Sequence, residues 1–378
     1  MNAQVNPAEP AQFEDRFAPV YQVLSEAIAA RAFPGCAFGV LLDGKVVLQD
    51  ALGRFTYDDD ATAVTPHTVY DVASLTKVVA TTTAAMLLYQ RGLLDLNLPL
   101  GELLPGFVIG RAPGGFARLV KLRHLLAHNS GLPGYVEFFR TVSTPGELLS
   151  ACLQLPIEAL PGARAEYSDP GFILLGKALE VLICEPLPLW LGREVFQPLG
   201  LTSTWFGPPA AFRPLIPPTE DDTTFRHRRI QGEVQDENAW LLNGAAGHAG
   251  IFSNVPDLLR FAREILDAIK PTTDVGAPRL FEVPTIEHFA ERQGPADSSR
   301  ALGWDTPSLK SSAGNHFSPH SIGHLGYSGC SLWIDLDAGV AAVLLTNRTW
   351  PDRQSQLIRE VRPAFHNAVR EALLSSHK

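Results

Sequence analysis

Apolar residues recur at helical spacing near both ends of the chain. In residues 12–32 they fall three or four positions apart, which predicts an amphipathic helix that Pro34 and Gly35 end. A similar apolar stripe between residues 357 and 373 predicts a long closing helix. Each of these helices needs an apolar surface to cover.

Strand patterns lie just inside the two helices. The dipeptide Asp43-Gly44, typical of a tight hairpin turn, joins the apolar stretches CAFGVLL and KVVLQDALG. A second hairpin is predicted around residues 337–339, between SLWIDL and VAAVLLTN. The chain therefore opens with a helix and strands and ends with strands and a helix.

The middle of the chain follows a different pattern. Helical periodicity, interrupted by Pro and Gly, predicts helices over 74–91, 119–128, 145–154, 169–183 and 187–197. Residues 205–245 are rich in Pro and charge and show no sustained period, which predicts a long irregular excursion.

Together these elements predict an α/β (α+β) fold. One antiparallel sheet is built from both chain ends and flanked by helices, with a mainly helical insertion between the two halves. We expect a sheet subdomain of residues 11–73 and 245–375, a helical subdomain of residues 74–244, and the active site between them. The length of 378 residues agrees with more than one small core.

Composition and charge exclude several classes of protein. The chain has 40 acidic and 31 basic residues, a formal net charge of −9, and a surface of that sign repels phosphate backbones. We therefore expect no nucleic-acid partner. The four cysteines include no Cys-x-x-Cys pair, so neither a disulfide framework nor a thiolate metal cluster is expected.

Two further patterns concern location. The first residues lack the basic start and apolar stretch of a secretory leader, and no run of 18 apolar residues predicts a membrane span. We expect a cytoplasmic protein, or a periplasmic or extracellular one if a signal peptide has been removed. The oligomeric state cannot be inferred from the sequence.

The segment around Ser74 carries the first candidate chemistry. Ser74 precedes a run of helix formers, and Lys77 lies three positions further along the same helical face. The lysine amine is placed to take the serine proton, and the helix N-terminus offers N–H donors to a developing oxyanion. Apolar neighbours such as Val72 and Val78 favour a neutral lysine, which a general base requires.

The Ser-x-x-Lys spacing does not identify a catalytic pair by itself. It also occurs at Ser375 and Lys378 in the C-terminal tail, where no helix follows. A helix-capping serine beside a solvated lysine has the same pattern.

Two later segments complete an order of motifs. YSD at residues 167–169 opens an apolar helical stretch, and HLG at residues 324–326 comes just before a strand. With SLTK at residues 74–77, these motifs resemble those of the penicillin-recognising serine hydrolases, which include class C β-lactamases, D-alanyl-D-alanine carboxypeptidases and related esterases. The flanking segments LRHLLAHNSGLPGY and GHAGIFSNVPDLLRFA also look similar to that family. The resemblance runs from about residue 30 to residue 350 and implies a β-lactamase/transpeptidase-like fold.

The resemblance implies a role for each matching residue. Ser74 would be the acylated nucleophile. Lys77 and Tyr167 would take its proton and return one to the leaving group, and Tyr167 would activate the water that clears the acyl-enzyme. The backbone N–H groups of Ser74 and Tyr327 would form the oxyanion hole, and His324 would be a cation or donor at the sheet edge of the cleft. No metal ion and no cofactor is implied.

Two positions depart from the pattern of this family. Leu325, next to Gly326 in the substrate-binding motif, replaces a threonine whose hydroxyl helps to hold a substrate carboxylate. Asp169 replaces an asparagine, and an acid there would repel a substrate carboxylate or, paired with Lys77, raise the pKa of that lysine. These departures favour an uncharged ester or a different amide over β-lactams and D-Ala-D-Ala peptides.

Other patterns indicate chemistry more weakly. Residues 326–330 nearly match Gly-x-Ser-x-Gly, but Cys330 replaces the last glycine and a strand follows instead of a helix. His124 and His128 lie one helical turn apart, yet they lack the glutamate of His-Glu-x-x-His, so core or capping histidines are favoured over a metal pair. His248 fits either the cleft or loop packing.

Two functions stay open from the sequence. The leading hypothesis is a serine hydrolase that cleaves a small amide or ester through an acyl-enzyme on Ser74. A carboxylesterase, muropeptide amidase or carboxypeptidase is favoured over a true β-lactamase. The alternative is a catalytically silent sensor that binds a peptidoglycan fragment, which Leu325 and Asp169 keep open. The expected partner is a small molecule or a short peptide in either case.

Overall fold

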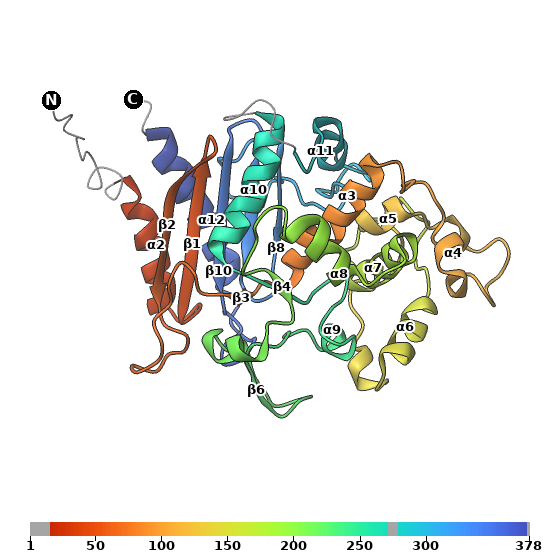
Figure 1. Cartoon of the computed structure of the whole chain (residues 1–378), viewed down its shortest axis with the longest axis horizontal. Coiled ribbons are helices and arrows are strands. Elements are labelled where there is room, and N and C mark those ends of the chain that lie inside the picture. The colour runs from red at the N-terminus through yellow and green to blue at the C-terminus, as the bar shows by residue number, and fades with distance from the viewer. Residues whose placement is uncertain (1–15, 271–278, 376–378) are drawn as a thin grey trace.

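A five-stranded antiparallel sheet lies on one side of the computed structural model, on the left in Figure 1, and the structure describes residues 16–270 and 279–375. The strand order is β2-β1-β10-β9-β8. The strands are β1 (Gly35–Leu42), β2 (Lys45–Gly53), β8 (Ser321–Leu325), β9 (Ser331–Asp335) and β10 (Val340–Thr346). Two strands come from the N-terminal part of the chain and three from the C-terminal part, so the predicted sheet is confirmed.

Both predicted hairpins form. Asp43 and Gly44 have φ angles of 47° and 74°, the left-handed conformation that a two-residue hairpin turn requires at both positions. Gly339, with φ 67°, turns the chain between β9 and β10. The backbone N–H of Asp43 donates to the carbonyl of Gly339 (2.9 Å), so the two turns support each other.

Helices cover both faces of the sheet, as Figure 1 shows. Helices α2 (Ala18–Ala29) and α12 (Ile358–Leu374) pack on one face with Phe38 and Val40, and α10 (Val255–Ile269) packs on the other with Leu41. The apolar stripes at the two chain ends therefore cover one common sheet surface. The start of the first predicted helix, residues 12–15, lies outside the described residues.

The insertion between the N-terminal and C-terminal strands consists mainly of helices, as predicted. Its elements up to residue 196 are η1 (Ala73–Leu75), η2 (Lys77–Thr82), α3 (Thr83–Gln90), α4 (Leu100–Leu103), η3 (Pro105–Phe107), η4 (Phe116–Leu119), α5 (Leu122–Leu126), η5 (Phe138–Arg140), α6 (Pro145–Leu153), α7 (Asp169–Ile183), α8 (Leu187–Leu191) and η6 (Gly192–Phe196). The helix predicted over 74–91 is in fact a 3₁₀ turn, a π-helical segment and an α-helix in succession. The one predicted over 119–128 is shorter, because His128 takes the left-handed φ of 54° and cannot continue a helix.

Residues 205–245 are largely irregular, as predicted, but contain short elements. These are β4 (Trp205–Phe206), η7 (Ala210–Leu215), β5 (Glu220–Asp222), β6 (Arg228–Ile230) and α9 (Glu237–Leu241). β4 joins β3 (Tyr70–Asp71) and β7 (Ile251–Ser253) in a small sheet of order β3-β7-β4, while β5 pairs with β6. The remaining helix, α11 (Val283–Ala290), packs against α3.

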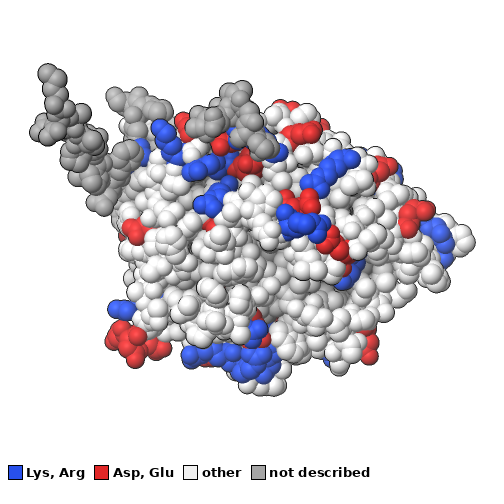
Figure 2. Space-filling view, viewed as in Figure 1, with Lys and Arg blue, Asp and Glu red and all other residues white. Residues whose placement is uncertain are grey.

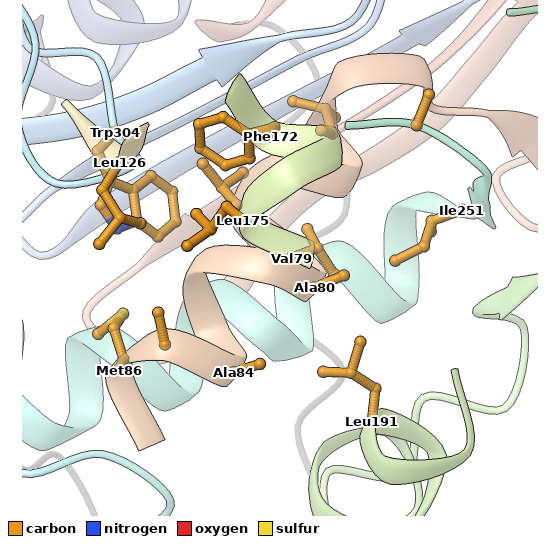
Figure 3. Close-up of a cluster of buried hydrophobic side chains, with 14 of the residues drawn as sticks. Val79, Ala80, Ala84, Met86, Leu126, Phe172, Leu175, Leu191, Ile251 and Trp304 are labelled. Carbon is orange, nitrogen blue, oxygen red and sulfur yellow. The ribbon is translucent and has the colours of Figure 1, made fainter. Parts of the chain in front are cut away.

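The segment η2–α3 passes through the larger hydrophobic core. Figure 3 shows Val79, Ala80 and Met86 of this segment in one cluster of buried side chains with Leu126, Phe172, Leu175, Leu191, Ile251 and Trp304. Apolar packing on several sides therefore holds the helix that carries Lys77 in one position.

The face of the molecule drawn in Figure 2 shows no large area of a single charge. Figure 2 shows Lys and Arg side chains and Asp and Glu side chains in small groups of both signs across the visible face. Among the helices of residues 16–270 and 279–375, none has the length and apolar character needed to cross a membrane.

A glycine contact fixes the loop behind the predicted catalytic lysine. A Cβ atom at Gly247 would lie 2.1 Å from the carbonyl oxygen of Phe172 and 3.0 Å from the Cα of Gly176, both in α7. The carbonyl of Gly247 also accepts a hydrogen bond from Thr81 Oγ1 (2.6 Å). Only glycine leaves room for this approach between α7 and η2.

We expect Gly247→Ala to lower the free energy of unfolding by about 1–3 kcal/mol, the usual cost of forcing an extra methyl group into a packed interior. Gly146→Ala is the matched control, because Gly146 lies exposed in α6 with open space around its Cα. Replacing it should leave stability unchanged or raise it by about 0.5–1 kcal/mol. Urea unfolding of both variants measures the difference, and equal midpoints would contradict the proposed contact.

Candidate active site

One large cavity collects residues from all three sequence motifs. Its volume is about 790 Å³, within the range of small-ligand sites. Ser74 comes from η1, Asp169 is the first residue of α7, Tyr167 lies two residues before it, and the HLG motif comes from the end of β8. The predicted site residues that line the cavity are Ser74, Tyr167, Asp169, His324, Leu325, Gly326 and Tyr327, and Lys77 lies buried behind Ser74.

A strained turn presents Ser74 to the cavity. Ala73 has the left-handed φ of 47°, which is costly for a residue with a side chain. The buried carboxylate of Asp71 holds this turn by accepting the backbone N–H groups of Ala73 (2.8 Å) and Gln235 (2.7 Å). Burial raises the pKa of Asp71 to about 6, although these two hydrogen bonds act in the opposite direction.

Three oxygen atoms surround the Nζ of Lys77. The distances are 2.9 Å to Ser74 Oγ, 3.1 Å to the carbonyl oxygen of His248 and 2.7 Å to Asp169 Oδ1. Burial lowers the pKa of Lys77, but the charges of Asp169 and Tyr167 oppose it and leave the pKa above its usual value. The expectation of a neutral lysine in an apolar environment is therefore wrong, because the carboxylate of Asp169 stabilises the ammonium form.

Tyr167 lies against the same lysine. Its ring centroid is 4.8 Å from Lys77 Nζ. Burial raises the pKa of Tyr167. The charge of Lys77 and the hydrogen bonds with Lys77 and Ser74 lower this pKa, but by less, so it stays above its usual value. The free site therefore holds both an ammonium group and a phenol at neutral pH, and a base appears only when the Lys77–Tyr167 pair loses one proton.

The two residues expected to supply the oxyanion donors line the cavity, and their backbone N–H groups have no acceptor among the described residues. Within the described part of the chain, the backbone N–H groups of Ser74 and Tyr327 donate to no other group. The turn that carries Tyr327 is held by Arg362, whose guanidinium donates to the carbonyl oxygens of Gly326, Gly329 and Cys330. This arrangement keeps two N–H donors available for a developing oxyanion.

Ser328 is not available as a nucleophile. It is completely buried, and its Oγ donates to the carbonyl oxygen of Asp71 (2.7 Å). The serine of this near match to Gly-x-Ser-x-Gly therefore has a structural role. Its hydrogen bond joins the turn before Ser74 to the turn that contains Tyr327.

His324 lines the cavity in its neutral form. Burial and the nearby charges of Lys77 and Arg300 hold its pKa well below the usual value. Its Nδ1 donates to the carbonyl oxygen of Leu325 (2.9 Å), which leaves Nε2 as a buried acceptor without a partner among the described residues. Of the two roles expected at this position, a cation or a donor, the cation is wrong, because the ring is buried beside the positive charges of Lys77 and Arg300.

His128 supports Tyr167, a role that the sequence motifs do not indicate. The Nδ1 of His128 accepts the backbone N–H of Ser168 (2.9 Å), and its carbonyl oxygen accepts that of Glu166 (2.7 Å). The imidazole ring lies 4.6 Å from the ring of Tyr167 and 4.9 Å from that of Phe172. Burial lowers the pKa of His128 well below its usual value, so Nδ1 remains an acceptor. The sequence signal that could have indicated His128 is the segment LRHLLAHNSGLPGY, which contains it and looks similar to the serine hydrolase family.

His124 and His128, which are one helical turn apart in the sequence, make separate backbone contacts. His124 Nδ1 accepts the N–H of Lys121 (3.1 Å), whereas His128 binds the YSD segment. Residues 16–270 and 279–375 include no cluster of three or more His, Cys, Asp or Glu side chains that could hold a metal ion.

The side chain of His248 is packed inside its loop, although the next residue, Ala249, lines the cavity. His248 is 1% exposed, and its Nε2 lies 2.8 Å from Asp236 Oδ1. Burial raises the pKa of Asp236, but the charge and hydrogen bond of His248 lower it to about 2. This pair fixes the loop whose carbonyl oxygen binds Lys77.

Comparison with known proteins places almost the whole chain in one group. Residues 20–363 match the family model described as Beta-lactamase. The chain is 31% identical to the N-acetylmuramyl-L-alanine amidase of Bacillus subtilis, over 90% of this chain and 83% of that protein. It is 30% identical to a protein of Salmonella typhimurium named provisionally as a D-alanyl-D-alanine carboxypeptidase, over 84% of this chain and 79% of that protein.

Solved structures have the same fold. EstCE1, described as a hydrolase with promiscuous acyltransferase activity, has a TM-score of 0.74 at 21% identity and covers 94% of this chain and 99% of its own. The octameric penicillin-binding protein homologue from Pyrococcus abyssi has a TM-score of 0.71 at 21% identity, over 94% of this chain and 77% of its own.

We expect Asp169→Asn to move the rising limb of the pH profile of kcat/KM to lower pH. The carboxylate of Asp169 raises the pKa of both Lys77 and Tyr167, so its removal lets the pair lose a proton at lower pH. Hydrolysis of a p-nitrophenyl ester between pH 5 and 10 measures the limb. Glu137→Gln, which removes a charge from the cavity rim, is the control, and a limb that stays in place in Asp169→Asn would contradict the assignment.

We expect His128→Leu to reduce kcat for the same ester by roughly 10²-fold, the size of effect that a small misplacement of a reacting group produces. His128→Asn should recover part of the loss, because its amide oxygen can accept the N–H of Ser168. KM and the thermal midpoint are measured alongside. An equal loss of kcat in both folded variants would show that His128 does not position Tyr167 through its hydrogen bond with the N–H of Ser168.

Proposed function

Because the chain belongs to the β-lactamase family of serine hydrolases, we propose that it cleaves small amides of cell-wall peptides through an acyl-enzyme on Ser74. The observation that carries the proposal is the contact of Ser74 Oγ with Lys77 Nζ (2.9 Å), beside Tyr167 in a cavity of about 790 Å³. A nucleophile, a proton-transfer pair and an entry for substrate are present together.

Acylation begins when Ser74 Oγ adds to the amide carbonyl carbon. Its proton passes to the Lys77–Tyr167 pair, which has first lost one proton, and the carbonyl oxygen becomes an oxyanion between the N–H groups of Ser74 and Tyr327. When the tetrahedral intermediate collapses, the C–N bond breaks. The leaving nitrogen takes a proton from Tyr167 and departs as an amine, and the acyl group stays on Ser74 as an ester.

Deacylation repeats these proton transfers with water. Tyr167 takes a proton from a water molecule as its oxygen adds to the ester carbonyl. The bond to Ser74 Oγ then breaks, and that oxygen receives the proton back from Tyr167. The overall reaction converts one amide and one water into a carboxylic acid and an amine, and the site returns to its starting protonation state.

The relatives support an amide as the substrate. The curated relative at 31% identity is named for the bond between N-acetylmuramic acid and L-alanine, and the one at 30% for a D-alanyl-D-alanine peptide. An ester is the second candidate, because Leu325 places an apolar side chain in the cavity wall. As part of the proposal, the reaction takes place in the cytoplasm on recycled wall fragments, which cell fractionation tests.

We expect Ser74→Ala to abolish covalent labelling by a fluorophosphonate and to reduce turnover by roughly 10³-fold or more. Intact mass spectrometry measures the label, and a panel of N-acetylmuramyl-L-alanine, a D-Ala-D-Ala peptide, a short-chain ester and a chromogenic cephalosporin measures turnover. Ser25→Ala, an exposed serine on α2, is the control and should retain both. Equal labelling of the two variants would exclude Ser74 as the nucleophile.

If the protein is instead a catalytically silent sensor, we expect the opposite result with the same panel of compounds. It would bind a muropeptide in calorimetry but turn over none of the compounds, and Ser74→Ala would bind as well as the parent chain. The presence of the serine, the lysine and the phenol in contact favours the enzyme.

A further inference from the structure

Arg300 brings a positive charge to the cavity wall beside Tyr167. The backbone of Arg300 is held at the edge of the five-stranded sheet. Arg300 forms a β-bridge with Asp305, and Asp305 exchanges two backbone hydrogen bonds with Gly323 of β8 (2.8 and 2.9 Å). The guanidinium carbon lies 5.1 Å from the centroid of the Tyr167 ring. The side chain of Arg300 is 23% exposed and lines the cavity.

The charge of Arg300 is poorly compensated within the protein. Among the described residues its guanidinium donates no hydrogen bond, and the nearest carboxylate oxygen, on Asp305, is 4.0 Å away. Asp305 is engaged elsewhere, because its Oδ1 accepts from Ser299 Oγ (2.6 Å) and from the N–H of Thr306 (3.1 Å). An arginine with unused donors facing a cavity is suited to bind an anion.

Three other arginines of the cavity wall, Arg348, Arg353 and Arg362, are occupied by groups of the protein. Arg353 pairs with the carboxylates of Glu220 and Glu237, and Arg348 donates to backbone carbonyl oxygens, one of them that of Tyr327. Arg362 holds the turn of residues 326–330 in the same way. These side chains support the protein, whereas Arg300 has its hydrogen-bonding groups free for a ligand.

The position of Arg300 matches one part of the proposed substrate. The leaving nitrogen must lie at the hydroxyl of Tyr167 to receive its proton. In an amide of an α-amino acid, the carboxylate carbon is two bonds from that nitrogen, so it lies next to the Tyr167 ring that Arg300 covers. Asp169 does not oppose a carboxylate there with an unpaired charge, because it is paired with Lys77 at 2.7 Å.

We propose that Arg300 binds the free carboxylate of an amino-acid leaving group, so that the enzyme prefers amides of single α-amino acids over their neutral or extended analogues. This inference rests on the proposed function and defines its substrate class. It also replaces the expectation that Leu325 and Asp169 disfavour carboxylate substrates: the missing threonine hydroxyl is compensated by a guanidinium from a different segment.

The test compares N-acetylmuramyl-L-alanine with its C-terminal amide, which differ only in the charge of the leaving group. We expect the parent enzyme to favour the free acid in kcat/KM by roughly 10–10²-fold, as for a charged hydrogen-bonded pair. Arg300→Gln should bring this ratio close to one, mainly by raising KM for the acid. Arg300→Lys should keep part of the preference, because it keeps the charge but loses the planar pair of donors.

Arg359→Gln is the matched control. Arg359, in the first turn of α12, is an exposed arginine in the wall of the same cavity. If charge in the cavity as a whole set the preference, both glutamine variants would reduce the ratio equally. A ratio that falls in Arg359→Gln and persists in folded Arg300→Gln would overturn the proposal.

A binding measurement separates this inference from the proposed function. N-acetyl-L-alanine and its amide are compared as competitors of fluorophosphonate labelling of Ser74. Protection by the acid that disappears in Arg300→Gln supports the carboxylate site even if no amide is turned over. Equal turnover of acid and amide by the parent enzyme, together with equal protection, would overturn the carboxylate site and leave the amidase function standing.

Discussion

The buried ammonium group of Lys77 is the constraint on which the site depends. Removing such a charge from water is costly unless oxygen atoms replace its hydration shell. Here those atoms come from Ser74, Asp169 and His248, on three segments that are far apart in the sequence. The lysine can be buried only if η1, the start of α7 and the loop before β7 meet, so its burial and the assembly of the site are one event.

The same ion pair determines how many protons the site holds. The carboxylate of Asp169 helps to raise the pKa of Lys77 and of Tyr167, so Lys77 stays positive and Tyr167 stays a phenol. The catalytic groups are thus in contact but not yet basic, and proton loss from the pair precedes nucleophilic attack. Because the charge of Asp169 is shared with the lysine, it does not dominate the cavity, and the positive field of Arg300 can act on a substrate.

A layer of buried polar groups holds the reacting groups in place. Asp71 fixes the strained turn at Ala73, His128 binds the backbone next to Tyr167, and Arg362 holds the turn that presents the Tyr327 N–H. Each acts on backbone groups, whose partners depend on the fold more than on residue type. These supports explain how a site formed by loops and helix ends remains ordered.

The sequence by itself determined the features that depend on neighbours in the chain. The Asp43-Gly44 turn, the strand pairs on either side of the turns and the closing amphipathic helix follow from local conformation and apolar period, and the order of three motifs indicated the family. Only the tertiary structure decided the charge of Lys77, the neutrality of His324, the support by His128 and the position of Arg300. A pKa and a ring contact depend on the distance to residues remote in sequence and on the exclusion of water, and neither quantity leaves a periodic pattern along the chain.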